Sequence, residues 1–296
     1  MSIRVNRMSG STGAEVVGAD LVRADTATLD ALRAAFLEHH VLAIRGQDLS
    51  PHQLLSFAAE FGEVFVHPYV PSLTGHPGLM EIYQMVPLTE TWHADVTFSA
   101  APPRTTVLHA RELPPAGGDT MFANQHLAYE RLSPGLRRVL DGLTAVHQGT
   151  SLAADAGLTE STVTATHPVV VAHPETGRPA LYVNADYTRR FADMTDEESA
   201  PLLAYLYEAA TRHEFAYRHR WLPGDVVMWD NRSVQHRGVN DYGSARRYLH
   251  RVTLEGSAPR PFSAAHTARR ADAADTSAAD TTGGTDTAGT TVGARG

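Results

Sequence analysis

Two histidines and one aspartate of this chain could together hold a metal ion. His93 and Asp95 stand two residues apart, and His236 follows far downstream. Two imidazoles and one carboxylate form the facial triad of non-haem Fe(II) oxygenases, which leaves coordination positions open for exchangeable ligands. Alternate residues of an extended segment point to the same side, so His93 and Asp95 can reach one metal. The spacing therefore predicts a metal site whose third ligand arrives from a distant strand.

The short pattern His-x-acid must be weighed against chance. With 16 histidines and 33 acidic residues in 296, roughly two such matches are expected by accident. The second match, His173-Pro-Glu175, stands among turn residues between two apolar runs, so we interpret it as a hairpin connection. The first match lies in residues 91–98, which are rich in aromatic and β-branched side chains. That composition indicates a strand or its entrance.

Arg247 and Arg251 follow His236 and could bind an oxo-acid cosubstrate. A guanidinium pairs bidentately with a carboxylate. A separation of four residues places both arginines on one side of a strand. The alternative is a solvated strand face, which is the usual environment of arginine. The metal ligands nearby favour the binding role.

Composition excludes several classes of chemistry. The chain contains neither cysteine nor lysine, which removes thiol nucleophiles, thiolate metal sites, Schiff-base catalysis and the P-loop lysine. A net charge of −8 provides no basic footprint for nucleic acid or an anionic membrane. No apolar run approaches the roughly 18 residues that span a bilayer, and the first residues lack the apolar core of a secretory signal. We expect a cytoplasmic protein without nucleic-acid or membrane partners.

The order of the expected elements favours one jelly-roll domain. Helices should begin after the capping residues Asp25, Ser50, Ser133 and Thr195, and the third should carry Leu136, Val139, Leu140 and Leu143. Strands are expected at residues 41–45, 106–109, 169–172, 180–183, 225–229 and 247–254. Strands without regular βαβ alternation indicate an α+β, mainly β fold, with a double-stranded β-helix (jelly roll) core and flanking helices. We expect this domain to cover residues 1–262 and a disordered low-complexity tail to cover 263–296.

Four segments resemble, in order, the signatures of the family of taurine dioxygenase, which includes alkylsulfatase and chlorophenoxyacetate dioxygenases. They are Trp92-His-Ala-Asp-Val-Thr-Phe98, Glu112-Leu-Pro-Pro-Ala-Gly-Gly-Asp-Thr120, Trp229-Asp-Asn-Arg232 with His236, and Arg246-Arg-Tyr-Leu-His-Arg251. The resemblance runs from the first helix to about Pro261. It implies a jelly roll that binds Fe(II), uses 2-oxoglutarate as cosubstrate and consumes O2.

The resemblance also implies roles for individual residues. His93, Asp95 and His236 would be the iron ligands. Thr120 and Arg247 would bind the far carboxylate of 2-oxoglutarate. Arg251 would be a fourth catalytic residue beside the three iron ligands. It would lie near the iron-chelating end of the cosubstrate and near the anionic group of the substrate.

The implied substrate pocket departs from that of taurine dioxygenase. His67 and Tyr69 resemble its taurine-contacting histidine and tyrosine, although the tyrosine follows by two residues rather than three. Thr89 stands where the family has a substrate-binding asparagine, and Ala153, beside Leu152, replaces an aromatic wall. Apolar or aromatic character is retained at Val96, Phe98 and Tyr187. These changes predict a substrate larger and less polar than taurine.

The resulting hypothesis is oxidation of a C–H bond in a small organic anion, a sulfonate, sulfate ester or carboxylate, with release of succinate and CO2. One alternative is a metal-dependent hydrolase that uses the same three ligands to activate water, but it does not explain Arg247 and Thr120. Another is a non-catalytic jelly-roll binding protein, which would not need the complete ligand set. An iron halogenase is disfavoured because Asp95 occupies the position that chloride would need. Assembly into a homo-oligomer stays open.

Overall fold

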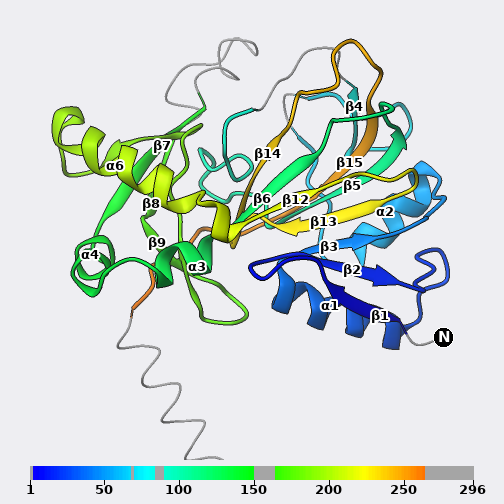
Figure 1. Ribbon diagram of the computed structural model, residues 1–296, viewed down its shortest axis with the longest axis horizontal. Helices are drawn as coiled ribbons and strands as arrows, with labels where there is room; N and C mark the ends of the chain where they lie inside the picture. The colour runs from blue at the N-terminus through cyan, green and yellow to red at the C-terminus, as the bar shows by residue number, and fades with distance from the viewer. Residues whose placement is uncertain (1–2, 68–69, 84–89, 150–163, 264–296) are drawn as a thin grey trace, which may run out of the picture. The chain divides into compact units, whose positions relative to one another are not determined.

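Two β-sheets face each other in the part of the molecule that contains strand β14 (Figure 1). In the computed structural model, which describes residues 3–67, 70–83, 90–149 and 164–263, the large sheet has the strand order β1-β2-β3-β13-β5-β15-β4. Its strands are β1 Arg4–Arg7, β2 Ala14–Val17, β3 Val41–Ile44, β4 Leu79–Tyr83, β5 Thr105–Glu112, β13 Val226–Asp230 and β15 Tyr248–Leu254. The small sheet has the order β12-β6-β14, with β6 Thr120–Asn124, β12 Ala216–His219 and β14 Val234–Gly238.

Apolar side chains from both sheets fill the layer between them. Because successive strand residues alternate between faces, each strand sends every second side chain into this layer. Phe122 of the small sheet and Trp229 of the large sheet meet with ring centroids 5.4 Å apart, and both are fully buried. The predicted double-sheet core is therefore present, and both sheets send functional side chains toward one inner layer.

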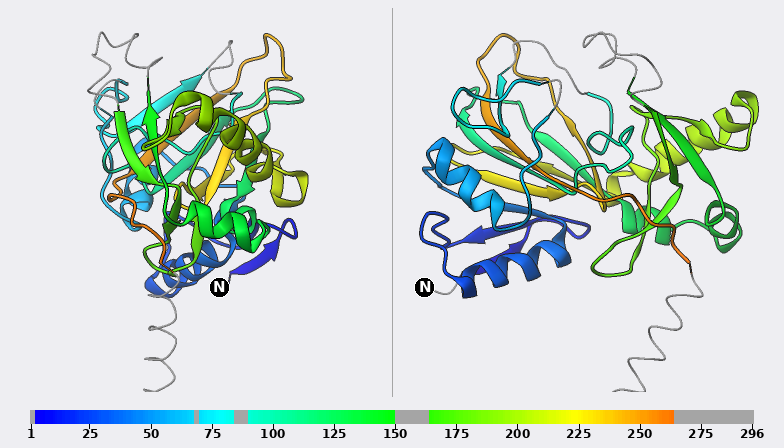
Figure 2. Two further views of the ribbon diagram at one scale, coloured as in Figure 1. Left: turned by 90° about the vertical axis from the view of Figure 1, so that its left-hand side faces the viewer. Right: turned by 180° about the vertical axis from the view of Figure 1, so that it is seen from behind.

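Two helices cover the outer face of the large sheet (Figures 1 and 2). Helix α1 spans Thr26–His39 and helix α2 spans Pro51–Ala59. Asp25 caps α1 by accepting from the Thr28 backbone N–H, and Ser50 forms a capping box with Gln53 at the start of α2. Both predicted helix starts are confirmed, since each side-chain oxygen satisfies an N–H that has no partner within the helix.

A second core forms where the remaining helices pack on short strands. It contains α3 Gln125–Glu130, α4 Pro134–Leu140, α6 Asp196–Ala210 and the 3₁₀ turn His213–Phe215. Its strands are β7 Thr144–Gln148, β8 Thr164–Pro168, β9 Val170–Ala172, β10 Pro179–Leu181 and β11 Thr188–Phe191. Helix α6 begins with the predicted Thr195–Glu198 capping box, and the β9–β10 hairpin is also as predicted.

One predicted helix is shorter than expected. Helix α4 starts after Ser133 but ends at Leu140, so Leu143 lies beyond it, and Val139 is 54% exposed. Asp141 and Gly142 follow the last turn, and both residue types are poor at continuing a helix. The helix carries Leu136, Val139 and Leu140 as predicted, but the expectation that it carries Leu143 was wrong.

Residues up to Phe262 form one compact unit. The tail that we expected to be disordered lies, apart from Ser263, outside the described residues. Within the described ranges, no helix combines the length and apolar character needed to cross a membrane.

Candidate metal centre and cosubstrate site

His93 and His236 are brought together by the backbone. They form an isolated antiparallel bridge between the segment before β5 and strand β14. His93 N donates to His236 O at 3.1 Å, and His236 N donates to His93 O at 2.7 Å. Residues directly opposite in such a pair project to the same face, and the two ring centroids lie 4.2 Å apart.

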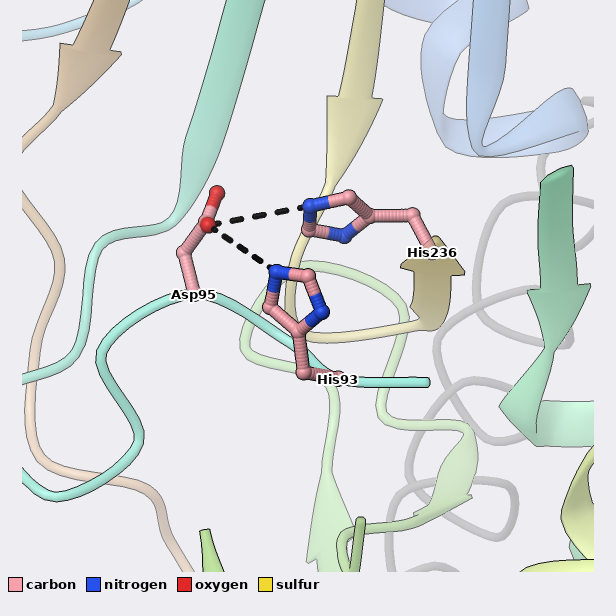
Figure 3. A group of neighbouring side chains, drawn as sticks. All are labelled: His93, Asp95 and His236. Carbon is pink, nitrogen blue, oxygen red and sulfur yellow. Dashed lines mark ion pairs between the residues drawn. The ribbon is translucent and has the colours of Figure 1, made fainter. Parts of the chain in front are cut away.

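Asp95 completes the group from the same segment as His93 (Figure 3). Its Oδ1 lies 3.8 Å from His93 Nε2 and 3.7 Å from His236 Nε2. The three ligand atoms all fall within 4.8 Å of one another, and the three residues are buried. One metal ion can contact all of them.

Hydrogen bonds and charge orient these side chains and shift two of their pKa values. The Nδ1 of His93 lies 2.9 Å from the Thr91 carbonyl oxygen, which can only accept, so Nδ1 carries a proton and Nε2 is the nitrogen that faces Asp95. Burial and the neighbouring His93 hold the pKa of His236 well below its usual range. Burial alone would raise the Asp95 pKa, but Arg251 and the two imidazoles hold it below the ordinary value.

The backbone around Asp95 differs from the predicted extended segment. His93 is extended in its bridge, whereas Asp95 already belongs to a turn. Val96 follows with a φ of 52°, a left-handed conformation that is unusual for a β-branched residue. Strain of this kind is typical of functional sites. The turn, rather than strand alternation, directs the Asp95 carboxylate toward the two histidines.

Arg247 and Thr120 meet at Trp221, as the resemblance implies for a shared cosubstrate site. Trp221 Nε1 donates to Thr120 Oγ1 at 3.1 Å, and the Arg247 guanidinium lies 5.7 Å from the Trp221 ring centroid. Arg247 Nε donates to the Gly118 carbonyl at 3.0 Å. Burial lowers the Arg247 pKa, and no carboxylate of the described residues forms an ion pair with it within 4.0 Å. An anionic ligand would supply the missing partner.

Thr120 and His236 share the inner face of the small sheet. Phe122 pairs with His236 and Thr120 pairs with Gly238 across β6 and β14. Thr120 and Phe122 are two residues apart on one strand, so their side chains point the same way. Thr120, a predicted cosubstrate residue, therefore lies near the predicted metal ligand His236.

Arg251 contacts the candidate metal centre directly. Its Nη2 lies 2.8 Å from Asp95 Oδ2, and its Nε donates to Thr253 Oγ1 at 3.2 Å. A guanidinium has five N–H groups, so these two contacts leave others for a further anion. Arg247 lies immediately before β15 rather than within it, but both arginines reach the inner layer.

Aromatic residues form a wall beside His93. Tyr187 lies edge-on to His93 with centroids 6.0 Å apart and to Phe98 with centroids 5.1 Å apart. The predicted wall residue Val96 is partly exposed. Burial lowers the His67 pKa, the charges of Arg251 and Asp95 also act on it, and its Nδ1 accepts from the Val70 backbone N–H at 3.0 Å. The predicted pocket residues Tyr69, Thr89, Leu152 and Ala153 lie outside the described residues.

The competing motif, His173-Pro-Glu175, forms the β9–β10 connection as predicted. His173 is nevertheless buried, and its Nε2 lies 3.0 Å from Asp230 Oδ2. Among the described residues, His93, Asp95 and His236 are the one group that could hold a metal ion. His173 therefore has a structural contact that its turn sequence did not indicate.

Two polar residues that hold Asp95 were missed by sequence reasoning. Thr106 Oγ1 donates to Asp95 Oδ2 at 2.6 Å, and Asn231 Nδ2 donates to the same oxygen at 3.2 Å. Asn231 belongs to the Trp229–Arg232 signature, which was the available signal. Thr106 stands in strand β5, whose sequence mixes polar and apolar residues, and it carried no signal of its own.

The sequence matches the family described as "Taurine catabolism dioxygenase TauD, TfdA family" over residues 4–253. The chain belongs to this family. It is 37% identical over 274 residues to an alkylsulfatase of Acinetobacter baylyi, covering 86% of this chain and 85% of the relative. It is 36% identical over 276 residues to an alpha-ketoglutarate-dependent sulfate ester dioxygenase of Pseudomonas putida, covering 88% and 91%.

A solved taurine dioxygenase from Burkholderia xenovorans superposes with a TM-score of 0.79 at 39% identity, covering 88% of this chain and 91% of that one. This similarity confirms the predicted jelly roll. Family membership makes the protein an enzyme of the alpha-ketoglutarate (2-oxoglutarate)-dependent dioxygenase class, and it argues against a non-catalytic binding protein.

Proposed function

We propose that this enzyme uses Fe(II) and 2-oxoglutarate to oxidise a C–H bond of an organic sulfate ester or a related sulfonate or carboxylate. The observation that carries the proposal is the convergence of His93 Nε2, His236 Nε2 and Asp95 Oδ1 within 4.8 Å. Two imidazoles and one carboxylate with open positions suit Fe(II). Fe(II) held there would supply O2 activation coupled to conversion of 2-oxoglutarate to succinate and CO2.

Arg247 and Thr120 are proposed to bind the distal carboxylate of 2-oxoglutarate. Arg247 is partly buried, burial lowers its pKa, and it has no carboxylate partner among the described residues. Such a cation is costly unless a ligand pairs with it. The Gly118 carbonyl holds Arg247 Nε, and the Nη groups, which donate to no described residue, would meet the carboxylate. These contacts support a keto-acid enzyme over a hydrolase, which needs no second anion site.

Arg251 and His67 are proposed to orient the anionic end of the substrate, while Val96, Phe98 and Tyr187 contact its apolar body. Arg251 already neutralises Asp95, so its remaining N–H groups would bind substrate as hydrogen-bond donors. The names of the two bacterial relatives, an alkylsulfatase and a sulfate ester dioxygenase, favour a sulfate ester. Oxidation of the carbon next to the ester oxygen would yield a product that releases sulfate.

A succinate-release assay with Fe(II), O2 and 2-oxoglutarate tests the proposal. The panel contains taurine, alkyl sulfates of increasing chain length, longer alkyl sulfonates and aryloxy acids. We expect longer apolar anions to release more succinate than taurine. The hydrolase alternative predicts sulfate release without O2 or 2-oxoglutarate, and that result would overturn the proposal. If taurine were the best substrate, only the prediction of an enlarged pocket would fail.

A further inference from the structure

The two oxygens of the Asp95 carboxylate have different environments. Oδ1 faces His93 and His236. Oδ2 receives three donors, which are Thr106 Oγ1 at 2.6 Å, Arg251 Nη2 at 2.8 Å and Asn231 Nδ2 at 3.2 Å. A carboxylate oxygen offers about two lone pairs. Three donors therefore saturate Oδ2, whereas Oδ1 keeps its lone pairs for a ligand.

The orientation of the Asn231 amide follows from its neighbours. Its Oδ1 receives Trp229 Nε1 at 3.0 Å and the Asp95 backbone N–H at 3.3 Å. An indole N–H and a backbone N–H can only donate, so the amide oxygen must face them. The amide nitrogen then faces Asp95 Oδ2 and Thr106 Oγ1, the latter at 3.2 Å. Because Thr106 accepts this bond, its own hydroxyl hydrogen is directed to Asp95.

The residues that hold Asp95 stand on the rigid part of the molecule. Thr106 lies in β5, where it pairs with Trp229 of β13 on one side and with Thr253 of β15 on the other. Asn231 follows the last residue of β13. Thr106 is 0% exposed and Asn231 is 3% exposed. Two central strands thus hold an aspartate that itself lies on a turn.

We propose that Thr106 and Asn231 are positioning residues that occupy Asp95 Oδ2, so that Asp95 offers only Oδ1 to the metal. The inference rests on the proposed metal-binding role of Asp95. A carboxylate that binds through both oxygens would fill one more coordination position. By preventing this, the two residues keep that position open for the cosubstrate or O2. They act through Asp95 and need not touch either molecule.

Titration with Co(II), a spectroscopic probe for the Fe(II) site, tests the proposal without turnover. Thr106→Val removes the hydroxyl at nearly constant volume. We expect its Co(II) dissociation constant to rise by about tenfold or more, as is typical when a residue that orients a metal ligand is lost. We also expect an altered visible Co(II) spectrum, because Oδ2 loses its shortest hydrogen bond and the carboxylate can then turn this oxygen toward the metal. Thr106→Ser keeps a hydroxyl at this position, so its Co(II) dissociation constant and its visible spectrum should both be close to those of the wild type.

Thr105→Val is the matched control. Thr105 is the adjacent residue of β5 and is also 0% exposed, but its hydroxyl has no hydrogen-bond partner among the described residues. The control should bind Co(II) as wild type does. If Thr106→Val does not fold, Thr106→Ala removes the same hydroxyl, with Thr105→Ala as its control.

Asp95→Ala separates failure of this inference from failure of the proposed function. If Asp95→Ala loses Co(II) while Thr106→Val keeps wild-type affinity and spectrum, the positioning role is wrong and the metal site stands. If Asp95→Ala binds Co(II) as wild type does, both proposals fail. If Thr105→Val and Thr106→Val weakened Co(II) binding equally, the cause would be a general packing effect, and this result would also overturn the positioning role.

Discussion

His93 and His236 are joined by two backbone hydrogen bonds, of 3.1 and 2.7 Å, although they are 143 positions apart in the sequence. Their side chains share a face because the bridge makes them direct neighbours across two segments. The main chain, rather than a metal ion, therefore brings the two imidazoles together. A site organised in this way should keep its shape when a ligand side chain is removed.

Replacing a ligand should remove metal binding without unfolding the protein. We predict that His93→Ala, Asp95→Ala and His236→Ala each lose stoichiometric Fe(II) and substrate oxidation, because each removes one of three proposed ligands. The bridge between residues 93 and 236 uses backbone atoms only, so circular dichroism should stay native. Metal content per folded protein and succinate release check this prediction, and near wild-type turnover in any variant would contradict it.

His173→Ala should have the opposite effect. It removes a buried hydrogen bond to the Asp230 carboxylate but no proposed ligand. We expect a loss of about 1–3 kcal/mol in the free energy of unfolding, measured with urea, while Fe(II) affinity at low temperature stays unchanged. A large loss of metal affinity in the folded variant would return His173-Pro-Glu175 to consideration as a metal site.

Arg247→Ala should weaken 2-oxoglutarate binding while Fe(II) still binds. Truncating a desolvated partner of a carboxylate costs about 2–5 kcal/mol, so the half-saturating 2-oxoglutarate concentration should rise by about tenfold or more. The adjacent Arg246 is the control, since its side chain is 64% exposed and pairs with Glu112 at the surface. Arg246→Ala should have almost no effect, and similar results for the two variants would remove Arg247 from the cosubstrate site.

Gly149→Ala should disturb the wall beside the candidate metal centre. A Cβ added at Gly149 would lie 2.6–2.8 Å from three atoms of the Phe98 ring, which is buried against Tyr187. The ring must shift, because these distances are well inside van der Waals contact. We predict a lower melting temperature and a changed ratio of succinate release between short and long anions. A wild-type ratio would mean that Phe98 does not contact substrate.

Acid should destabilise the fold through two buried histidines. His40 and His126 have ring centroids 5.0 Å apart, and burial lowers their pKa values to about 4 and about 3. The unfolded chain protonates these residues near pH 6.5. Their contribution to the free energy of unfolding is therefore complete above pH 6.5. It is lost as the pH falls toward their pKa values in the folded protein, by about 1.4 kcal/mol per pH unit for each histidine.

The variant His40→Asn tests this pH dependence. Asparagine tolerates the left-handed φ of 64° at this position and does not titrate. Urea unfolding between about pH 7 and pH 5 should give a shallower slope of stability against pH for the variant than for wild type. Parallel slopes would show that His40 does not contribute.

Local sequence signals determined much of the structure before any long-range contact was known. Asp25, Ser50 and Thr195 each cap a helix at the predicted position, because a capping side chain bonds to backbone N–H groups only a few residues away. His93-Ala-Asp95 and the family signatures likewise identified candidate ligands by residue type and spacing. The prediction that α4 carries Leu143 was wrong, because the apolar pattern continues in the sequence past Asp141-Gly142, where the helix ends.

Only the tertiary structure decided how those side chains work together. Asn231 reaches Asp95 across 136 positions, and Thr106 reaches it from the central strand β5, where nothing in the local sequence distinguishes it. The same holds for His173, a turn residue that becomes buried against Asp230. Sequence patterns report which face of an element is apolar, since that depends on local periodicity. Which donor meets which carboxylate oxygen depends on strand pairing between distant segments, and no local pattern encodes it.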